Sequence, residues 1–445
     1  MIKKIICDFY HLLLFVFFVF FTSCKTTNNT FAYRNVDSVE IDVKKDIYTF
    51  DQKEEMPILA WIGVQEHTVE RYRELKEVGI NHNFSSFINI EELSNAMRAA
   101  RRAKIKMIIH IYDLDNELEK MAKRFKNHSA LAGYFIGDEP NRNSFSHLAE
   151  LTRRVQEIDK KHFCYINLYP NYAYLEQLGT TTYREYVQLF LKEVPVEILS
   201  FDYYPIRVND SGERFLNKIW YENLEIISDE ARKAVKPFWA FALTTAHGPY
   251  PIPTLADLRL QIFSNLAYGA QGIQYFTYWT PPFETEELGY NNGPIDNNKH
   301  EKTTTWYTVQ QMNKEIKNLS NVFLGAHVIK VEHITINSSG KNGDIPKGTT
   351  RFDFSNKPAE AFIIKKFDIP NNTNAVVSFL KNGNKCYMVV INRNLYGGEN
   401  VTFTIEGDAD LQLVKKDGTI VPAASESSSQ TITPGDALIY GWDIK

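Results

Sequence analysis

Short apolar runs alternate with amphipathic stretches along most of the chain, from Pro57 to Leu319. Runs that are apolar throughout are typical of strands buried on both faces of a parallel sheet, and apolar positions at a spacing of three to four residues are typical of helices. The predicted strands are Ile58–Gly63, Ile80–Phe84, Ile105–Ile111, Leu131–Ile136, Phe163–Leu168, Glu197–Asp202, Pro237–Leu243 and Gly272–Thr277. The helices predicted to follow them are Val69–Val78, Glu91–Ala103, Glu117–Phe125, Phe145–Ile158, Tyr183–Lys192, Trp220–Ala234, Leu255–Tyr268 and Thr305–Leu319.

Eight strand–helix units within about 270 residues predict a (β/α)8 barrel, a TIM barrel of the α/β class, over residues 57–324. A doubly wound open sheet would place a glycine-rich phosphate turn after its first strand. This chain has Val64-Gln65-Glu66-His67 there. The barrel is therefore the favoured fold.

The pattern changes after Leu324. Short alternating runs, including Ala375–Leu380, Lys385–Asn392, Asn400–Ile405 and Ala437–Trp442, are separated by Asn-Gly, Gly-Gly and Asp-Gly turns. Residues 325–445 are therefore predicted to form an all-β sandwich that packs against the barrel as an accessory domain.

The amino terminus departs from the globular pattern. Lys3 and Lys4 precede ten consecutive apolar residues, Leu12–Phe21, too few to span a bilayer as a helix. The run ends in Phe-Thr-Ser-Cys24, which resembles a bacterial lipobox, and the phenylalanine-rich run with its polar tether resembles lipoproteins of Bacteroidetes. Residues 1–24 are thus predicted to be a lipoprotein signal with Cys24 as the lipidated residue, and residues 25–56 a tether and an extended lead-in strand, Phe31–Phe50. An uncleaved membrane anchor is the alternative.

Composition narrows the class of partner. The 445 residues are 44% hydrophobic and 23% charged, which excludes a disordered chain, and a net charge of −4 with no basic stripe argues against nucleic acid. Cys164 and Cys386 fall in different predicted domains, so no disulfide is expected, and without a cluster of cysteine and histidine we expect no metal site. The predicted location is the cell envelope, with the chain held to the outer membrane, on its periplasmic or surface face, through Cys24.

Polar and aromatic side chains follow the predicted strands, where barrel enzymes carry their active sites. Carboxylates, amides and aromatic rings predominate over lysine and arginine, a set that suits sugar hydroxyls and sugar C–H faces better than phosphate groups. Carbohydrate is therefore the predicted partner. The candidate substrate-binding residues are Glu66, Asn83, Asp113, Asp138, Asn141, Asn167, Tyr203, Tyr204, His247, Tyr278 and Trp279.

The sharpest motif is Gly137-Asp138-Glu139-Pro140-Asn141, directly after the fourth predicted strand. Together with Ser200–Pro205 (SFDYYP) and the AYGAQGI segment before the eighth strand, it resembles the (β/α)8 glycoside hydrolases, especially the clan A and family 42-like enzymes. The resemblance implies that Glu139 is the general acid/base and that the barrel needs no cofactor. Glycosidic cleavage needs a second carboxyl group, which attacks the sugar or activates water.

The second carboxylate departs from the clan A pattern. That clan places its nucleophile at the end of strand seven, but residues 237–248 (PFWAFALTTAHG) contain no acid. Asp202, at the end of strand six, is the substitute that we predict as the second catalytic residue. Its carboxyl group is expected ~6.5–9.5 Å from that of Glu139, the inverting spacing. The pairing also resembles clan D barrels, in which Asp138 or Glu139 would be the nucleophile and Asp202 the acid.

The sequence thus predicts a glycoside hydrolase that cleaves O-glycosidic bonds of a poly- or oligosaccharide, by a retaining or an inverting mechanism. The alternatives are a non-catalytic glycan-binding lipoprotein with a degenerate hydrolase barrel, and a structural surface lipoprotein.

Overall fold

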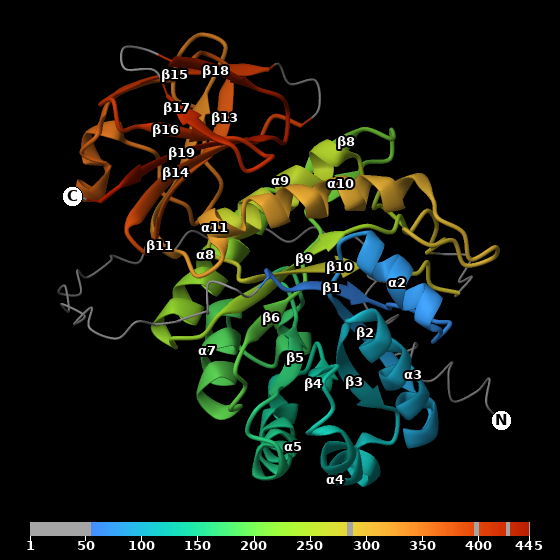
Figure 1. Cartoon of the computed structure of the whole chain (residues 1–445). Coiled ribbons are helices and arrows are strands. Elements are labelled where there is room, and N and C mark those ends of the chain that lie inside the picture. The colour runs from blue at the N-terminus through green and yellow to red at the C-terminus, as the bar shows by residue number, and fades with distance from the viewer. Residues whose placement is uncertain (1–54, 283–287, 396–399, 424–427, 445) are drawn as a thin grey trace. The chain divides into compact units, whose positions relative to one another are not determined.

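Eight parallel strands close into a barrel in the computed structural model, which describes residues 55–282, 288–395, 400–423 and 428–444 (Figure 1). The strand order is β1-β2-β3-β4-β5-β6-β9-β10, and β1 pairs with both β2 and β10. This confirms the predicted barrel. The barrel strands are β1 (Ile58–Trp61), β2 (His82–Phe87), β3 (Lys106–Ile111), β4 (Leu131–Asp138), β5 (Phe163–Leu168), β6 (Leu199–Phe201), β9 (Phe238–Leu243) and β10 (Gly272–Phe276).

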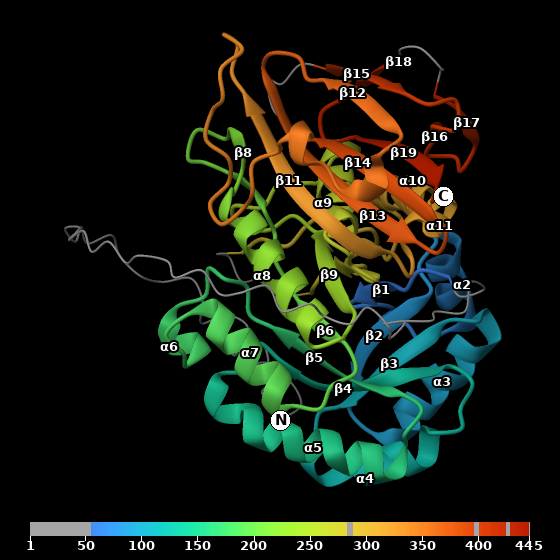
Figure 2. The same ribbon diagram turned by 90° about the vertical axis from the view of Figure 1, so that its left-hand side faces the viewer.

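Helices surround the barrel (Figures 1 and 2). Several begin at residues whose side chains accept backbone N–H groups, as Thr68 does from Arg71 and Asn89 from Glu91. The helices that follow barrel strands are α2 (Val69–Glu77), α3 (Ile90–Ala103), α4 (Leu114–Phe125), α5 (Phe145–Ile158), α7 (Tyr183–Glu193), α8 (Ile219–Lys233), α9 (Leu255–Ala267) and α10 (Thr304–Asn318). Shorter ones are α6 (Leu175–Leu178), α11 (Ser320–Phe323), and the single turns η1 (Arg142–Ser144), η2 (Phe354–Asn356) and η3 (Ala359–Ala361).

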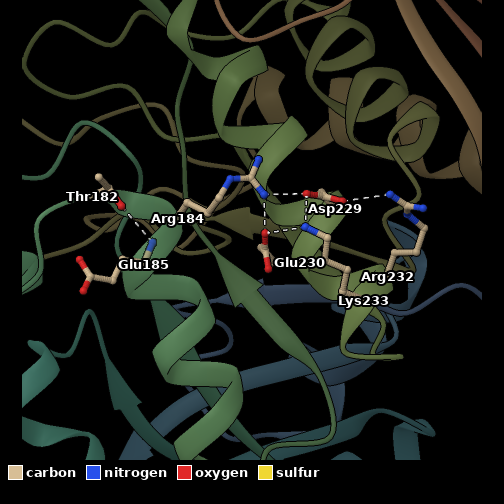
Figure 3. Close-up of polar contacts among 7 residues, drawn as sticks. All are labelled: Thr182, Arg184, Glu185, Asp229, Glu230, Arg232 and Lys233. Atoms are coloured by element: carbon tan, nitrogen blue, oxygen red, sulfur yellow. Dashed lines mark hydrogen bonds and ion pairs between the residues drawn. The ribbon is translucent and has the colours of Figure 1, made fainter. Parts of the chain in front are cut away.

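An ion-pair network joins neighbouring helices α7 and α8 (Figure 3). Arg184 of α7 lies 2.6 Å from Asp229 of α8 and also contacts Glu230, while Arg232 and Lys233 share the same carboxylates. Because several charges share these contacts, the network positions the two helices better than one exposed pair would.

Alternate residues of each barrel strand pack on opposite sides. Trp61, Phe135 and Phe241 belong to a cluster inside the barrel, whereas Ala60 and Tyr134 pack between the strands and the helices. This two-sided burial explains why the strands are apolar along their whole length.

A two-stranded hairpin that the sequence analysis did not predict follows β6. It consists of β7 (Ile206–Val208) and β8 (Arg214–Leu216), with Arg207 opposite Phe215. The Val208 N–H donates to the carbonyl of Pro249 at 2.8 Å, so the hairpin is tied to the loop after β9.

The C-terminal part consists of two antiparallel sheets that share one apolar core, as predicted for a sandwich. Phe379 and Met388 of the larger sheet pack in the same cluster as Phe367 and Phe403 of the smaller one. The larger sheet has the order β11 (His327–Ile336), β13 (Thr373–Asn382), β14 (Lys385–Asn392), β19 (Ala437–Asp443), β16 (Gln412–Val414) and β17 (Ile420–Pro422); the smaller has β12 (Ile364–Asp368), β15 (Val401–Gly407) and β18 (Ser428–Ile432).

The sandwich packs on helix α9 of the barrel. Ser378 Oγ of β13 donates to the carbonyl of Ala267 at 2.7 Å, and the Tyr268 hydroxyl lies 2.8 Å from His333 Nε2. The barrel and the sandwich both fall within one compact unit, Ile47–Lys445. The boundary predicted at Leu324 falls between α11 and β11.

The predicted signal, Cys24, the tether and the lead-in strand Phe31–Phe50 lie outside the described residues. Of the helices in the described part, none has the length and apolar character needed to cross a membrane. Cys164 and Cys386 are both buried with free thiols, the first in the barrel and the second in the sandwich.

Candidate active site at the carboxyl end of the barrel

The end of β4 is bent by a bulge. Phe135 pairs with Tyr165, but the next two pairs are Gly137 with Ile166 and Asp138 with Asn167, so β4 has one extra residue. A bulge of this kind re-aims the side chains that follow it. Asp138 consequently faces the barrel interior with Asn167, while Gly137 faces outward, where a Cβ would lie 3.1 Å from Leu148 of α5.

The backbone of Glu139 is held in an unusual conformation. Its φ of 42° lies in the left-handed region, which a non-glycine residue adopts only when its surroundings enforce it. The Glu139 N–H donates to the Asn167 carbonyl at 2.8 Å, and the Tyr186 hydroxyl of α7 donates to the Pro140 carbonyl at 2.7 Å. These two bonds hold the turn that carries Glu139.

Asn167 connects the carboxylates of two strands. Its Nδ2 group donates to Asp138 Oδ1 and to Asp202 Oδ1, each at 3.1 Å. The Asn167 Oδ1 accepts from Ser200 Oγ at 2.9 Å, which fixes the orientation of the amide. Asp138, at the end of β4, and Asp202, after β6, are thereby held on the two sides of β5.

A buried hydrogen-bond network inside the barrel holds the Asn167 side chain in place. Ser200 Oγ also accepts from Gln274 Nε2 at 2.9 Å and lies 2.7 Å from the Tyr165 hydroxyl, which donates to Gln274. Tyr165, Ser200 and Gln274 are fully buried. A network whose members are all paired is rigid, so it fixes the side chains above it.

Burial raises the pKa of all three acids, and repulsion by neighbouring carboxylates raises the pKa of Asp138 and Glu139 further. Burial raises the pKa of Glu139 well above its usual value, and the charges of Asp202 and Asp138 raise it further. Burial also raises the pKa values of Asp138 and Asp202, although the Asn167 amide opposes the rise in both. Asp202 receives further hydrogen bonds from Glu139, Tyr204 and its own backbone, which favour its ionised form.

The carboxyl groups of Glu139 and Asp202 are hydrogen-bonded to each other. Our expectation of a separation of ~6.5–9.5 Å was therefore wrong. The bulge and the left-handed turn bring Glu139 over β5 toward Asp202, an effect that strand spacing alone does not reveal. Two carboxyl groups in contact share one proton, so one member of the pair is protonated while the other is ionised.

Tyrosines surround the acid pair. Tyr204 hydrogen-bonds with Asp202, and Tyr172 with Tyr250. The charges of Asp202 and Glu139 raise the pKa values of the hydroxyls of Tyr169, Tyr172 and Tyr250 beyond what burial does. Sequence reasoning missed Tyr172 and Tyr250 because they lie in loops, four or more residues beyond the strand ends.

The end of β9, where clan A enzymes carry their nucleophile, is occupied by two threonines. Thr244 Oγ1 donates to the Thr277 carbonyl at 2.8 Å, and Thr245 Oγ1 lies 2.9 Å from Thr277 Oγ1. These side chains tie β9 to the end of β10, so the second carboxylate has to come from elsewhere.

Three of the predicted binding residues make local contacts instead of joining the acids. Glu66 forms ion pairs with Arg71 at 2.7 Å and with His300 at 2.9 Å. Exposed Asp113 precedes α4 and accepts from Asn116 at 2.7 Å. Asn141 donates to the carbonyls of residues 176 and 177 and accepts from the N–H of residue 143, which secures the turn after Pro140.

Other predicted residues are buried. Asn83 is fully buried and accepts from the N–H of Val64, so it supports the first loop. Tyr203, Tyr278 and Trp279 pack in the cluster outside the barrel strands, and Trp279 lies under Arg71. His247 is 8% exposed and packs between Tyr250 and Tyr290. Of the predicted residues, the structure brings together Asp138, Glu139, Asn167, Asp202 and Tyr204.

Within the described ranges, no cluster of three or more histidine, cysteine, aspartate or glutamate side chains is arranged to hold a metal ion.

A family comparison agrees with this site. Residues 179–319 match the glycoside hydrolase family 42 model, described as beta-galactosidase. The second half of the barrel is thus similar to this family. The match includes Asp202 and confirms the resemblance that the motifs predicted, while Glu139 lies before it.

Solved structures with a similar chain trace include several glycosidases. A beta-galactosidase from the psychrophilic Marinomonas ef1 is 10% identical with a TM-score of 0.43, and the match covers 60% of each chain. An alpha-amylase from Anoxybacillus (9% identity, TM-score 0.48) is matched over 88% of this chain and 98% of its own. A beta-galactosidase from Halorubrum lacusprofundi (9%, 0.47) is matched over 87% and 99%. No curated protein sequence matches the chain.

Proposed function

We propose that the chain hydrolyses O-glycosidic bonds of an oligo- or polysaccharide, with Glu139 as the proton donor and Asp202 as the ionised carboxylate. The observation that carries the proposal is the direct contact between these two carboxyl groups at the carboxyl end of a glycoside hydrolase barrel. Glu139 has a raised pKa and little support for its charge, whereas Asp202 accepts hydrogen bonds from Asn167 and Tyr204. Glu139 therefore holds its proton more tightly than Asp202 does.

The contact favours retention of configuration. An inverting enzyme holds its carboxyl groups ~6.5–9.5 Å apart to admit a water molecule, and a retaining enzyme holds them ~5–5.5 Å apart. The hydrogen-bonded pair is nearer to the retaining spacing and has to separate to admit the sugar. In the proposed reaction Glu139 protonates the leaving oxygen while Asp202 attacks the anomeric carbon. Glu139 then removes a proton from the water that breaks the glycosyl–Asp202 ester, which restores both groups.

The test is hydrolysis of a glycan panel that begins with β-galactosides, as the family description suggests. We expect Glu139→Gln and Asp202→Asn each to lower kcat/KM by at least about 10³-fold. Glu157→Gln, which changes an exposed carboxyl on α5, serves as the control and should keep full activity. NMR of the first product should show the anomer of the substrate.

A non-catalytic glycan-binding protein is the alternative outcome. It would release no sugar from any member of the panel, yet bind one glycan as tightly in the Glu139→Gln variant as in the wild type. Hydrolysis with inversion would keep the enzyme but exclude Asp202 as the nucleophile.

The proposal includes export and lipid anchoring at Cys24. The positive start, the short apolar run and the Phe-Thr-Ser-Cys24 ending support it. When the gene is expressed in a bacterium that processes lipoproteins, the wild type should enter the detergent phase in a phase-separation assay. The Cys24→Ser variant should lose acyl labelling; equal labelling of both forms would contradict the anchor.

A further inference from the structure

Arg207 lies in the β7–β8 hairpin, two residues beyond the Tyr-Tyr-Pro segment that follows Asp202. The hydrogen bond from Val208 to Pro249 holds β7 against the loop that carries Tyr250. As a result the Arg207 guanidinium lies over the Tyr250 ring, with Cζ 5.6 Å from the ring centroid. Tyr250 is 5% exposed, so the arginine stacks on a fixed surface.

The Arg207 guanidinium is not fully satisfied by its neighbours. Its Nε atom is buried and has no hydrogen-bond partner among the described residues. Other half-buried arginines of the barrel do pair: Arg142 with Glu193 at 2.6 Å, and Arg71 with Glu66 at 2.7 Å. A buried N–H without an acceptor costs free energy, so its retention suggests that a ligand supplies the acceptor.

A second unpaired polar group lies close to it. The hydroxyl of Tyr203 is buried without a partner, and the charge of Arg207 opposes the rise of its pKa. Tyr203 is 1% exposed and contacts the edge of the Tyr172 ring, at a centroid distance of 5.0 Å. A guanidinium N–H can only donate, so the unpaired Nε of Arg207 calls for an acceptor, which an anion with several oxygens supplies.

The Tyr250 hydroxyl lies within electrostatic range of Arg207 and of both members of the acid pair, Asp202 and Glu139, and it hydrogen-bonds with Tyr172. The half-buried acid cluster repels a negatively charged sugar. A cation fixed beside it lowers that repulsion and pairs with the negative group.

We propose that Arg207 binds an anionic substituent of the sugar next to the scissile bond, so that the substrate is an acidic glycan. The inference rests on the proposed glycosidase function and specifies its substrate class. A uronic acid carboxylate and a sulfate ester share the chemistry that the guanidinium recognises, since each offers two oxygens to its planar donors.

The test compares three forms of one oligosaccharide: neutral, oxidised at C6 to the uronic acid, and sulfated. We expect the wild type to cleave one anionic form at least ten-fold more efficiently than the neutral form. Arg207→Gln should lower kcat/KM for the anionic form about ten- to a hundred-fold and for the neutral form less than about three-fold. Arg207→Lys should recover part of the loss, because lysine keeps the positive charge but lacks the two parallel N–H donors of the guanidinium.

Lys218→Gln is the matched control, since it removes an exposed positive charge from the same loop. It should change kcat/KM for neither the anionic nor the neutral form. An equal loss on all three forms in Arg207→Gln, or a wild type that prefers the neutral form, would overturn the inference. Whichever anionic form, the uronic acid or the sulfated one, loses efficiency in Arg207→Gln identifies the group that Arg207 recognises.

Binding to the inactive Glu139→Gln protein separates this inference from the proposed function. Calorimetry with the uronic acid and sulfated forms should show binding that Glu139→Gln/Arg207→Gln loses. If Arg207-dependent binding is present but no form is hydrolysed, the proposed function fails and the anion site stands. If the neutral form is hydrolysed and Arg207 has no effect, the reverse holds.

Discussion

At the scale of single residues, the site depends on how protons are distributed among three carboxyl groups. Glu139 and Asp202 carry the chemistry in our proposal, but Asn167 decides which of them is ionised, because its amide donates to both aspartates and to neither oxygen of Glu139. Asn167 is therefore a positioning residue. Its effect should appear in the pH dependence of the reaction and not only in the rate.

Asn167→Ala should shift the acidic limb of the kcat/KM profile upward. The amide lowers the pKa values of Asp138 and Asp202, so its loss raises both. Because a hydrogen bond to a charged group contributes about 1.5–3 kcal/mol, the shift should be about 1–2 pH units. Ser200→Ala, which removes only the bond that orients the amide, should shift the limb less. An unchanged limb in Asn167→Ala would show that Asp202 does not need to ionise.

Glu139→Gln should stabilise the protein at alkaline pH. The pKa of Glu139 is raised in the folded state, so the folded form binds the proton more tightly than the unfolded chain does. Stability from this group is complete below the unfolded pKa of ~4.3 and is lost as pH rises through the raised pKa. In thermal unfolding, the free energy of unfolding of the variant should therefore exceed that of the wild type by about 1–2 kcal/mol at pH 8 and equal it at pH 4. Glu157→Gln should show no such trend, and a variant less stable at pH 8 would contradict a raised pKa.

At the scale of elements, the strand–helix pattern predicted the barrel well but its turns poorly. The strand Phe163–Leu168 and the helix Phe145–Ile158 have their predicted bounds, because burial on one or two faces determines where apolar residues fall. The β4 bulge, the left-handed turn at Glu139 and the β7–β8 hairpin have no such periodic signal. They depend on contacts between segments far apart in sequence, such as the hydrogen bond between Tyr186 and Pro140. The motif therefore predicted the place of Glu139 but not how close its carboxyl group lies to that of Asp202.

Tyr186→Phe should weaken the turn that carries Glu139. The variant leaves the Pro140 carbonyl buried without its donor, which costs about 1–3 kcal/mol in unfolding free energy. Since the same turn aims Glu139, kcat should fall about ten-fold. Tyr134→Phe is the matched control: it removes a buried tyrosine hydrogen bond of 2.7 Å to Asp159, on the outer face of the same strand, and should lower stability without lowering kcat. Equal activity of both variants would show that α7 does not position the turn.

At the scale of the whole described structure, the sandwich and the barrel are packed together as one structural unit. Ten of the residues of α9 are buried, and the sheet strands β13, β14 and β19 pack against this helix. Arg259 of α9 pairs with Glu315 of α10 and lies 3.6 Å from Asp436, next to β19, which Lys416 also contacts. Asp436 is 5% exposed, so these charges are largely removed from water.

Asp436→Ala should destabilise both parts together. Removing Asp436 leaves Lys416 without a counter-charge and Arg259 with Glu315 alone, at a cost of about 3–5 kcal/mol for a buried ion-pair network. Calorimetry should show one cooperative transition in the wild type and one transition at a lower Tm in the variant, with hydrolysis lost over the same temperature range. Asp443→Ala, at an exposed pair with Lys385 on the end of β19, is the control and should shift the Tm little. Two separate transitions, with only the sandwich shifted, would show instead that the barrel folds independently and that residues 325–445 are a dispensable module.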